Sequence, residues 1–173
     1  IMETSSYAAV SQPGYRESKT YMVAALFVIG NIVLPQLCHL IPQGGLIWLP
    51  IYFFTLVAAY KYGPVAGLLT AVVSPLVNSA FFGMPAAASL PIILIKSVVL
   101  ALAASFIASK VRGVRFWAVL LAVVAYQAIG FVAEWGMTGS LVDAFQDIRL
   151  GWPGLLVQAV GGFALMRYVK VLK

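Results

Sequence analysis

The residue of greatest chemical interest is Lys96, because it lies inside the otherwise apolar stretch of residues 90–109. At about 1.5 Å per helical residue, this stretch spans the ~30 Å hydrocarbon core of a bilayer. A lysine inside such a segment costs roughly 2.5–3.5 kcal/mol on insertion scales, so its ammonium must meet a partner or a polar cavity. Either Lys96 contacts an anionic part of a ligand, or it forms an ion pair with Glu134 that only joins two helices.

A small group of other polar or aromatic residues lies within or beside apolar stretches and is also a candidate for ligand binding. The candidates are Glu134, Gln158, Gln127, Asn78, Asn31, Trp48, Tyr52 and His39. The amides can also serve as hydrogen-bonding contacts between helices. The aromatic residues, together with Trp135 and Trp152, are equally typical of the belt at a membrane interface.

The composition predicts an integral membrane protein. The chain has 173 residues, of which 62% are hydrophobic and 9% are charged, and its mean hydropathy is +0.99. Soluble domains carry about 25% charged residues, so this chain lacks the polar surface that would cover a soluble core. A polar, mixed tail of residues 1–19 precedes a transmembrane domain of residues 20–173 and is not a secretory signal peptide.

The apolar runs predict an all-α bundle of six transmembrane helices. The expected spans are residues 20–37, 47–60, 65–81, 90–109, 116–137 and 152–169. A tight turn at residues 61–64 separates the second span from the third. The longest and most polar loop is 138–151, which contains Asp143, Asp147 and Arg149.

The positive charges orient this bundle. Six spans place both termini on one side, and that side receives Arg16, Lys19, Lys61, Lys110, Arg112, Arg115, Arg167, Lys170 and Lys173. The opposite side receives only Arg149. By the positive-inside rule, both termini are cytoplasmic, and this rule also accounts for the net charge of +6 without any nucleic-acid partner.

With this orientation, the intramembrane polar groups fall in the outer half of the bundle. Lys96 lies about 9 Å from the outer end of its helix, and Glu134 and Gln158 lie at a similar depth. The inner half has almost no polar groups, whereas a channel needs a polar path through the whole membrane. The pattern predicts a cup that is open outward and sealed inward.

The sequence gives little support for an enzyme, a metal site or a cofactor. Cys38-His39 is an isolated pair without a matching set of metal ligands, and we interpret it as an ordinary pair near a loop. The single histidine near the outer surface does not form a catalytic set with a serine and an acid. No phosphate-binding loop of the G-x-x-x-x-G-K-[ST] type is present.

Several short motifs in residues 42–105 resemble one membrane-protein family. They are a Gly-rich loop at 44–45, "LP" at 49–50, "YGPVAGLL" at 62–69, "SPL" at 74–76, "GMP" at 83–85 and a second "LP" at 90–91. In these motifs the chain resembles the substrate-binding S components of energy-coupling factor (ECF) transporters. The resemblance covers about a third of the chain closely.

The resemblance implies a multi-pass subunit of the bacterial cytoplasmic membrane that captures a vitamin or related micronutrient at the outer face. Its partners would be a membrane coupling protein and two ATPases. The family often docks the coupling protein through an Ala-x-x-x-Ala patch on the first helix. Here Ala24 is followed by Val28 and Ala25 by Ile29, so the pattern is incomplete, although these four residues are the candidates.

Two other functions are compatible with the same residues. A structural or assembly protein would use its intramembrane polar groups only to join helices. A self-sufficient secondary carrier would transport its substrate without ATPases, although no internal repeat supports an inverted-repeat architecture.

Overall fold

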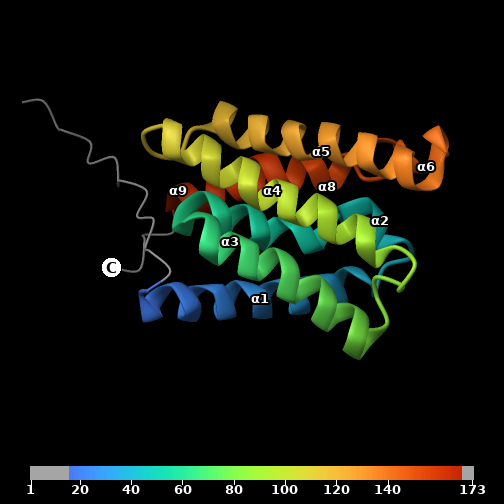
Figure 1. Cartoon of the computed structure of the whole chain (residues 1–173), viewed down its shortest axis with the longest axis horizontal. Coiled ribbons are helices and arrows are strands. Elements are labelled where there is room, and N and C mark those ends of the chain that lie inside the picture. The colour runs from blue at the N-terminus through green and yellow to red at the C-terminus, as the bar shows by residue number, and fades with distance from the viewer. Residues whose placement is uncertain (1–15, 169–173) are drawn as a thin grey trace, which may run out of the picture.

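The computed structural model describes residues 16–168, which form helices and, within that range, no strand. The long helices lie roughly along one axis, and consecutive helices run in alternating directions (Figure 1). Within the described range, four helical stretches are long and apolar enough to cross a membrane. They are α1 (Ser18–Cys38), the stretch Pro50–Phe82, α4 (Leu90–Lys110) and α5 (Phe116–Thr138). The prediction of an all-α protein is confirmed, and these four stretches are those expected of a membrane protein.

The stretch Pro50–Phe82 begins with a short 3-10 helix, η1 (Pro50–Tyr52), and continues as α3 (Phe53–Phe82). α3 is not straight, because Gly63 has φ 88° and ψ −176° and breaks it into two arms, 53–62 and 64–82. A Cβ atom built on Gly67 would lie only 2.5 Å from the Ala59 Cβ, although eight residues extend about 12 Å along a straight helix. The two arms therefore fold back on each other as a hairpin.

Gly63 is required at the bend for a conformational reason. Its positive φ lies in a region that residues with a Cβ rarely adopt, whereas glycine adopts it at little cost. Pro64 follows directly and begins the second arm, where its missing N–H is not needed for a helical hydrogen bond. The predicted turn at residues 61–64 is thus the bend between two arms of one helix.

The remaining segments are short. α2 (Gly44–Trp48) precedes η1, and α6 (Leu141–Ala144) and α7 (Gln146–Arg149) follow α5. α8 (Trp152–Leu156), the π-helix η2 (Val157–Gly161) and α9 (Gly162–Tyr168) run end to end as the last described column. A Cβ atom on Gly154 would meet the backbone of Trp48, so α8 packs directly against the end of α2.

Large buried side chains from three helices form the centre of the bundle. Leu56 and Tyr60 of α3, Leu100 of α4, and Val119 and Tyr126 of α5 are all fully buried. The Tyr60 hydroxyl donates a hydrogen bond to the Gly113 carbonyl at 3.3 Å. This contact ties the bend of α3 to the turn between α4 and α5, at the end of the bundle where α1 begins (Figure 1).

The structure corrects several predicted boundaries. The predicted spans 47–60 and 65–81, with the turn between them, correspond to the two arms of α3, but the first arm begins only at residue 53, because the residues before it form α2 and η1. The predicted tail of residues 1–19 ends earlier, because α1 begins at Ser18; residues 1–15 lie outside the described part. The predicted loop 138–151 contains α6 and α7, and the predicted sixth span includes a π-helix at its centre. The end of that span, residue 169, also lies outside the described part.

Candidate functional site

Lys96 is buried in the bundle and pairs with two carboxylates. Only 3% of Lys96 is exposed, and its Nζ donates hydrogen bonds to Glu134 Oε2 and to Asp147 Oδ2, the latter at 2.8 Å. Lys96 belongs to α4, Glu134 to α5 and Asp147 to α7, so the three side chains join three segments. The ion pair with Glu134 that the sequence suggested is present, and Asp147 is a second partner that the sequence did not identify.

The side chain of Lys96 fits between the helices because Gly130 has no side chain. Gly130 and Glu134 lie one turn apart on the same face of α5. A Cβ atom at position 130 would be 2.7 Å from Lys96 Cγ and 3.0 Å from Lys96 Cε. Gly130 thus provides the space through which the lysine reaches the Glu134 carboxylate.

A second buried polar cluster contains Tyr126, Gln127 and Gln158. The Tyr126 hydroxyl donates to Gln158 Oε1 at 2.8 Å and accepts from Gln127 Nε2 at 3.0 Å. Tyr52 packs against Tyr126 with ring centroids 5.3 Å apart. The two clusters are neighbours, because Tyr126 and Gly130 lie one turn apart on the same face of α5 and Gly130 borders the Lys96 side chain. The structure therefore brings Tyr52, Gln127 and Gln158 together with the pair Lys96–Glu134.

The backbone around this second cluster departs from regular helix at two places. Gln158 lies in the π-helix η2, a conformation that occurs frequently at functional sites. Its Nε2 donates to the carbonyl of Leu49 at 3.4 Å, and Leu49 has φ 44° although it is not a glycine. Irregular backbone within the bundle is thus buried against protein, as the absence of water in a membrane requires.

Asn31 and Asn78, in contrast, are used by contacts between helices. The i+4 residue of Asn31 is Pro35, which has no N–H, so the Asn31 carbonyl lacks its helical donor. Asn78 Nδ2 supplies that donor at 2.9 Å. The Asn31 side chain accepts from the Phe54 N–H at 3.1 Å and donates to Thr55 Oγ1 at 2.9 Å. These amides join α1 to both arms of α3.

The remaining predicted ligand residues lie nearer the surface. Trp48 is 38% exposed, and Trp135 and Trp152 are 47% and 58% exposed, as expected of an interfacial belt. His39 follows the last residue of α1 and is half-buried, and its Nδ1 is buried without a hydrogen-bond partner among the described residues. Within residues 16–168, the hydrogen bonds of the Lys96 ammonium go to Glu134 and Asp147 and to none of these side chains.

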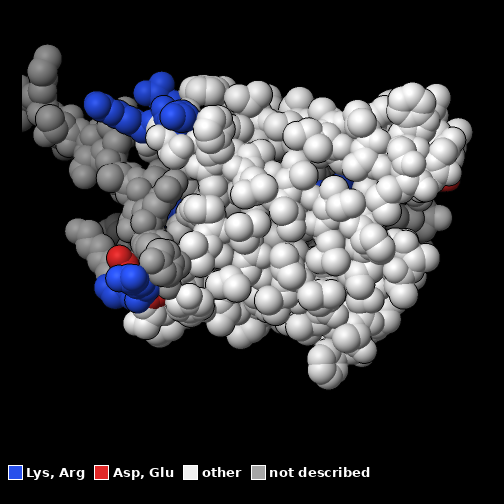
Figure 2. Space-filling view, in the orientation of Figure 1, with Lys and Arg blue, Asp and Glu red and all other residues white. Residues whose placement is uncertain are grey.

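The charged residues divide between the two ends of the bundle. Lys and Arg side chains gather where α1 begins and where α4 passes into α5 (Figure 2). Glu134, Asp143 and Asp147 belong to the other end, near α6 and α7. Lys170 and Lys173, which were predicted to join the basic residues, lie outside the described part of the chain.

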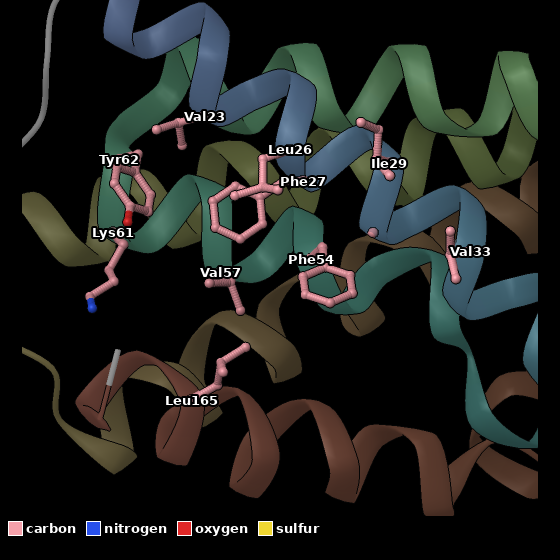
Figure 3. Close-up of a pocket in the computed structure, with 11 residues that line it drawn as sticks. Val23, Leu26, Phe27, Ile29, Val33, Phe54, Val57, Lys61, Tyr62 and Leu165 are labelled. Carbon is pink, nitrogen blue, oxygen red and sulfur yellow. The ribbon is translucent and has the colours of Figure 1, made fainter. Parts of the chain in front are cut away.

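A groove of about 460 Å³ runs along the side of the bundle, away from the Lys96 cluster. It is bordered by α1, the first arm of α3 and α9, and nearly all of its lining is apolar (Figure 3). Lys61 and Tyr62 stand at one end, next to Val23. Ile29 lines this groove and is 57% exposed.

The four residues predicted for docking a coupling protein do not share one environment. Ala25 and Ile29 are exposed on the surface of α1, and Val28 is half-buried. Ala24 is 3% exposed and packs with Val23 and Ala66 inside the bundle. Ala24 therefore does not contribute to the surface that a partner could touch.

Asp147, Tyr126 and Gly130 belong to the site but were not predicted from the sequence. Asp147 was visible only as one of two acids in a polar loop, and Tyr126 as one of many aromatic residues in apolar runs. Gly130 lies one helical turn before Glu134, and this spacing was the one signal that could have identified it.

In residues 16–168 no group of three His, Cys, Asp or Glu side chains is placed to hold a metal ion.

Comparisons of the chain with protein families, with curated proteins and with solved structures found no match. The resemblance to ECF S components therefore remains a prediction from the sequence motifs.

Proposed function

We propose that the chain is a membrane-embedded binding subunit of an importer that captures a small molecule at the outer face of a bacterial cytoplasmic membrane. The observation that supports this proposal is the buried Lys96 paired with the partly buried Glu134 and Asp147, next to Tyr52 and Tyr126, at the end of the bundle opposite the basic residues. Intramembrane ionisable residues mark ligand or ion sites by default. Positively charged ends of membrane helices face the cytoplasm, so the buried cluster would face outward.

The proposal includes six membrane crossings with both termini in the cytoplasm. α1, the two arms of α3, α4, α5 and the column α8–η2–α9 would each cross once. The second arm, residues 64–82, is about 28 Å long and the last column, residues 152–168, about 25 Å. The first arm with η1 is shorter, about 20 Å, and α2 would complete its path through the outer leaflet.

The partners follow from the family resemblance. A membrane coupling protein and two ATPases would supply the energy, as in the transporters that the motifs resemble. The exposed face of α1 that carries Ala25 and Ile29, next to the apolar groove, is the surface that we propose for docking the coupling protein.

Affinity purification of the full-length chain from its own cells in a mild detergent tests this function. We expect a membrane protein and two nucleotide-binding proteins to be enriched with the chain. A variant with Ile29→Glu places a charge on the proposed docking face and should lose them, whereas Ile129→Glu, on an exposed position of α5, should retain them. Enrichment without any ATPase would contradict the importer.

One observation favours the structural alternative. Lys96 and the amides of Asn31, Asn78, Gln127 and Gln158 all have partners inside the chain. A structural or assembly protein would need nothing more, because such contacts join helices without a ligand. It would bind no small molecule, whereas a secondary carrier would transport one in liposomes that contain no ATPase.

A further inference from the structure

We infer that the small molecule bound by this site is an organic cation, such as a protonated amine or an aromatic ammonium compound. This inference rests on the function proposed above and identifies the class of substrate. It reverses the expectation that Lys96 pairs with an anionic group of the ligand. The reason is the charge balance of the buried cluster in the structure.

The cluster contains one positive and two negative side chains. Lys96 contributes +1, and Glu134 and Asp147 contribute −1 each, so the sum is −1. The other two charges on α6 and α7, Asp143 and Arg149, are exposed and of opposite sign, so they cancel and are screened by water. A partly buried charge without a counter-charge is unfavourable, and a cationic ligand would provide the missing counter-charge.

The side chains of the cluster also differ in the fraction of their surface that is exposed. Lys96 is 3% exposed, whereas both carboxylate side chains are 14% exposed. Lys96 also uses only one oxygen of each carboxylate, Glu134 Oε2 and Asp147 Oδ2. The two carboxylate side chains are thus more accessible than the side chain that carries the ammonium.

The neighbouring groups suit a cation as well. The rings of Tyr52 and Tyr126 pack together with centroids 5.3 Å apart, and Tyr126 lies one turn before Gly130, which borders the Lys96 side chain. Tyrosine faces attract cations through the ring quadrupole. Ser97 is fully buried, and its hydroxyl has no hydrogen-bond partner among the described residues. Ser97 lies two turns before Ser105 on the same face of α4, and Ser105 contacts the first arm of α3.

The contact of Ser105 indicates that Ser97, two turns earlier on the same face of α4, lies near the start of the first arm of α3. Ser105 donates to the carbonyl of Ala59, and α4 runs in the same direction as the first arm (Figure 1). Eight residues before Ala59 is position 51, next to Tyr52. By this register Ser97 lies at the level of Tyr52, and its hydroxyl has no hydrogen-bond partner among the described residues.

Dialysis against a rich mixture tests the inference and requires no advance choice of compound. The purified full-length chain in detergent micelles is dialysed against yeast extract, and retained small molecules are identified by mass spectrometry. We expect the retained compound to carry a net positive charge at pH 7. In Asp147→Asn its retention should fall about tenfold or more, because one of the two carboxylates of the cluster is lost.

Asp143→Asn is the matched control, because it removes the same charge from an exposed position of the neighbouring helix and should leave retention unchanged. Gel filtration establishes that each variant is folded, and Glu134→Gln replaces Asp147→Asn if the latter aggregates. A neutral or anionic retained compound, or equal retention of the cation by the carboxylate variants, would overturn the inference and leave the binding function standing. Retention of nothing by the unmodified chain would instead contradict the proposed function.

Discussion

Lys96 of α4 lies against Gly130 of α5 so closely that a Cβ atom at position 130 would stand 2.7 Å from the lysine Cγ. The contact allows a charged side chain to pass between two packed helices and reach Glu134. A glycine in the interior of a helix is normally unfavourable by about 0.5–1 kcal/mol relative to alanine. Its presence here is explained by the space that the lysine needs.

Gly130→Ala should therefore destabilise the protein, although alanine is the better helix former. The added methyl group pushes against the stem of Lys96, and overpacking of this kind costs about 1–3 kcal/mol. The free energy of unfolding, measured by titration with SDS in mixed micelles, checks this expectation. Gly136→Ala is the matched control, because a Cβ there meets nothing within 4 Å, and it should be neutral or stabilising. Equal effects of both substitutions would contradict the contact.

Lys96→Met should lower the free energy of unfolding strongly. It leaves two partly buried carboxylates without their partner, and removal of one member of a buried ion pair costs about 3–5 kcal/mol. The triple variant Lys96→Met/Glu134→Gln/Asp147→Asn should recover most of this loss, since it leaves no charge behind. The same SDS titration measures both variants. A Lys96→Met protein within about 0.5 kcal/mol of the unmodified chain would show that the ion pairs do not form.

The hydrogen bond from Asn78 to the Asn31 carbonyl should depend on Pro35. Asn78→Ala leaves that buried carbonyl without a donor, which costs about 1–3 kcal/mol. Pro35→Ala supplies a helical N–H to the same carbonyl, so Asn78→Ala should cost less in the Pro35→Ala background. A double-mutant cycle measures this difference, and we expect a coupling of about 0.5–3 kcal/mol. Additive effects would mean that the two residues do not serve one acceptor.

Labelling of single cysteines tests the proposed topology. Cys38 is the only cysteine of the chain and is partly exposed at the end of α1, so a membrane-impermeant maleimide should label it in intact spheroplasts. In a Cys38→Ser background, Ser109→Cys lies at the opposite end of the bundle and should react only after permeabilisation. The reverse pattern would invert the orientation.

A third cysteine position tests the α3 hairpin in the same background. Pro64 is exposed at the bend, so Pro64→Cys should react only after permeabilisation, as Ser109→Cys does. If the stretch Pro50–Phe82 crossed the membrane as one straight helix, position 64 would lie in the middle of the bilayer and would not react. This position therefore distinguishes a hairpin that crosses twice from a single crossing.

Sequence periodicity and hydropathy predicted the long helices well. The predicted spans 20–37, 90–109 and 116–137 agree with α1, α4 and α5 to within two residues at each end. Long apolar runs bounded by charges have few alternatives in a bilayer, because every backbone group must be hydrogen-bonded within the segment. Residues 44–52 and 157–161 were not predicted correctly, since a 3-10 turn or a π-helix depends on which neighbours satisfy the backbone.

In the candidate site, too, the sequence predicted one part and the tertiary structure decided the other. Hydropathy alone identified Lys96 as a residue that needs a partner, because a charge inside an apolar helix is costly whatever surrounds it. The identity of its partners was decided only by tertiary structure. Asp147 reaches Lys96 because α6 and α7 fold back over the bundle, 51 positions along the chain from the lysine, and no local pattern encodes such a contact. The roles of Asn31 and Asn78 were decided in the same way, by a carbonyl that Pro35 leaves without its helical donor and that a helix distant in sequence satisfies.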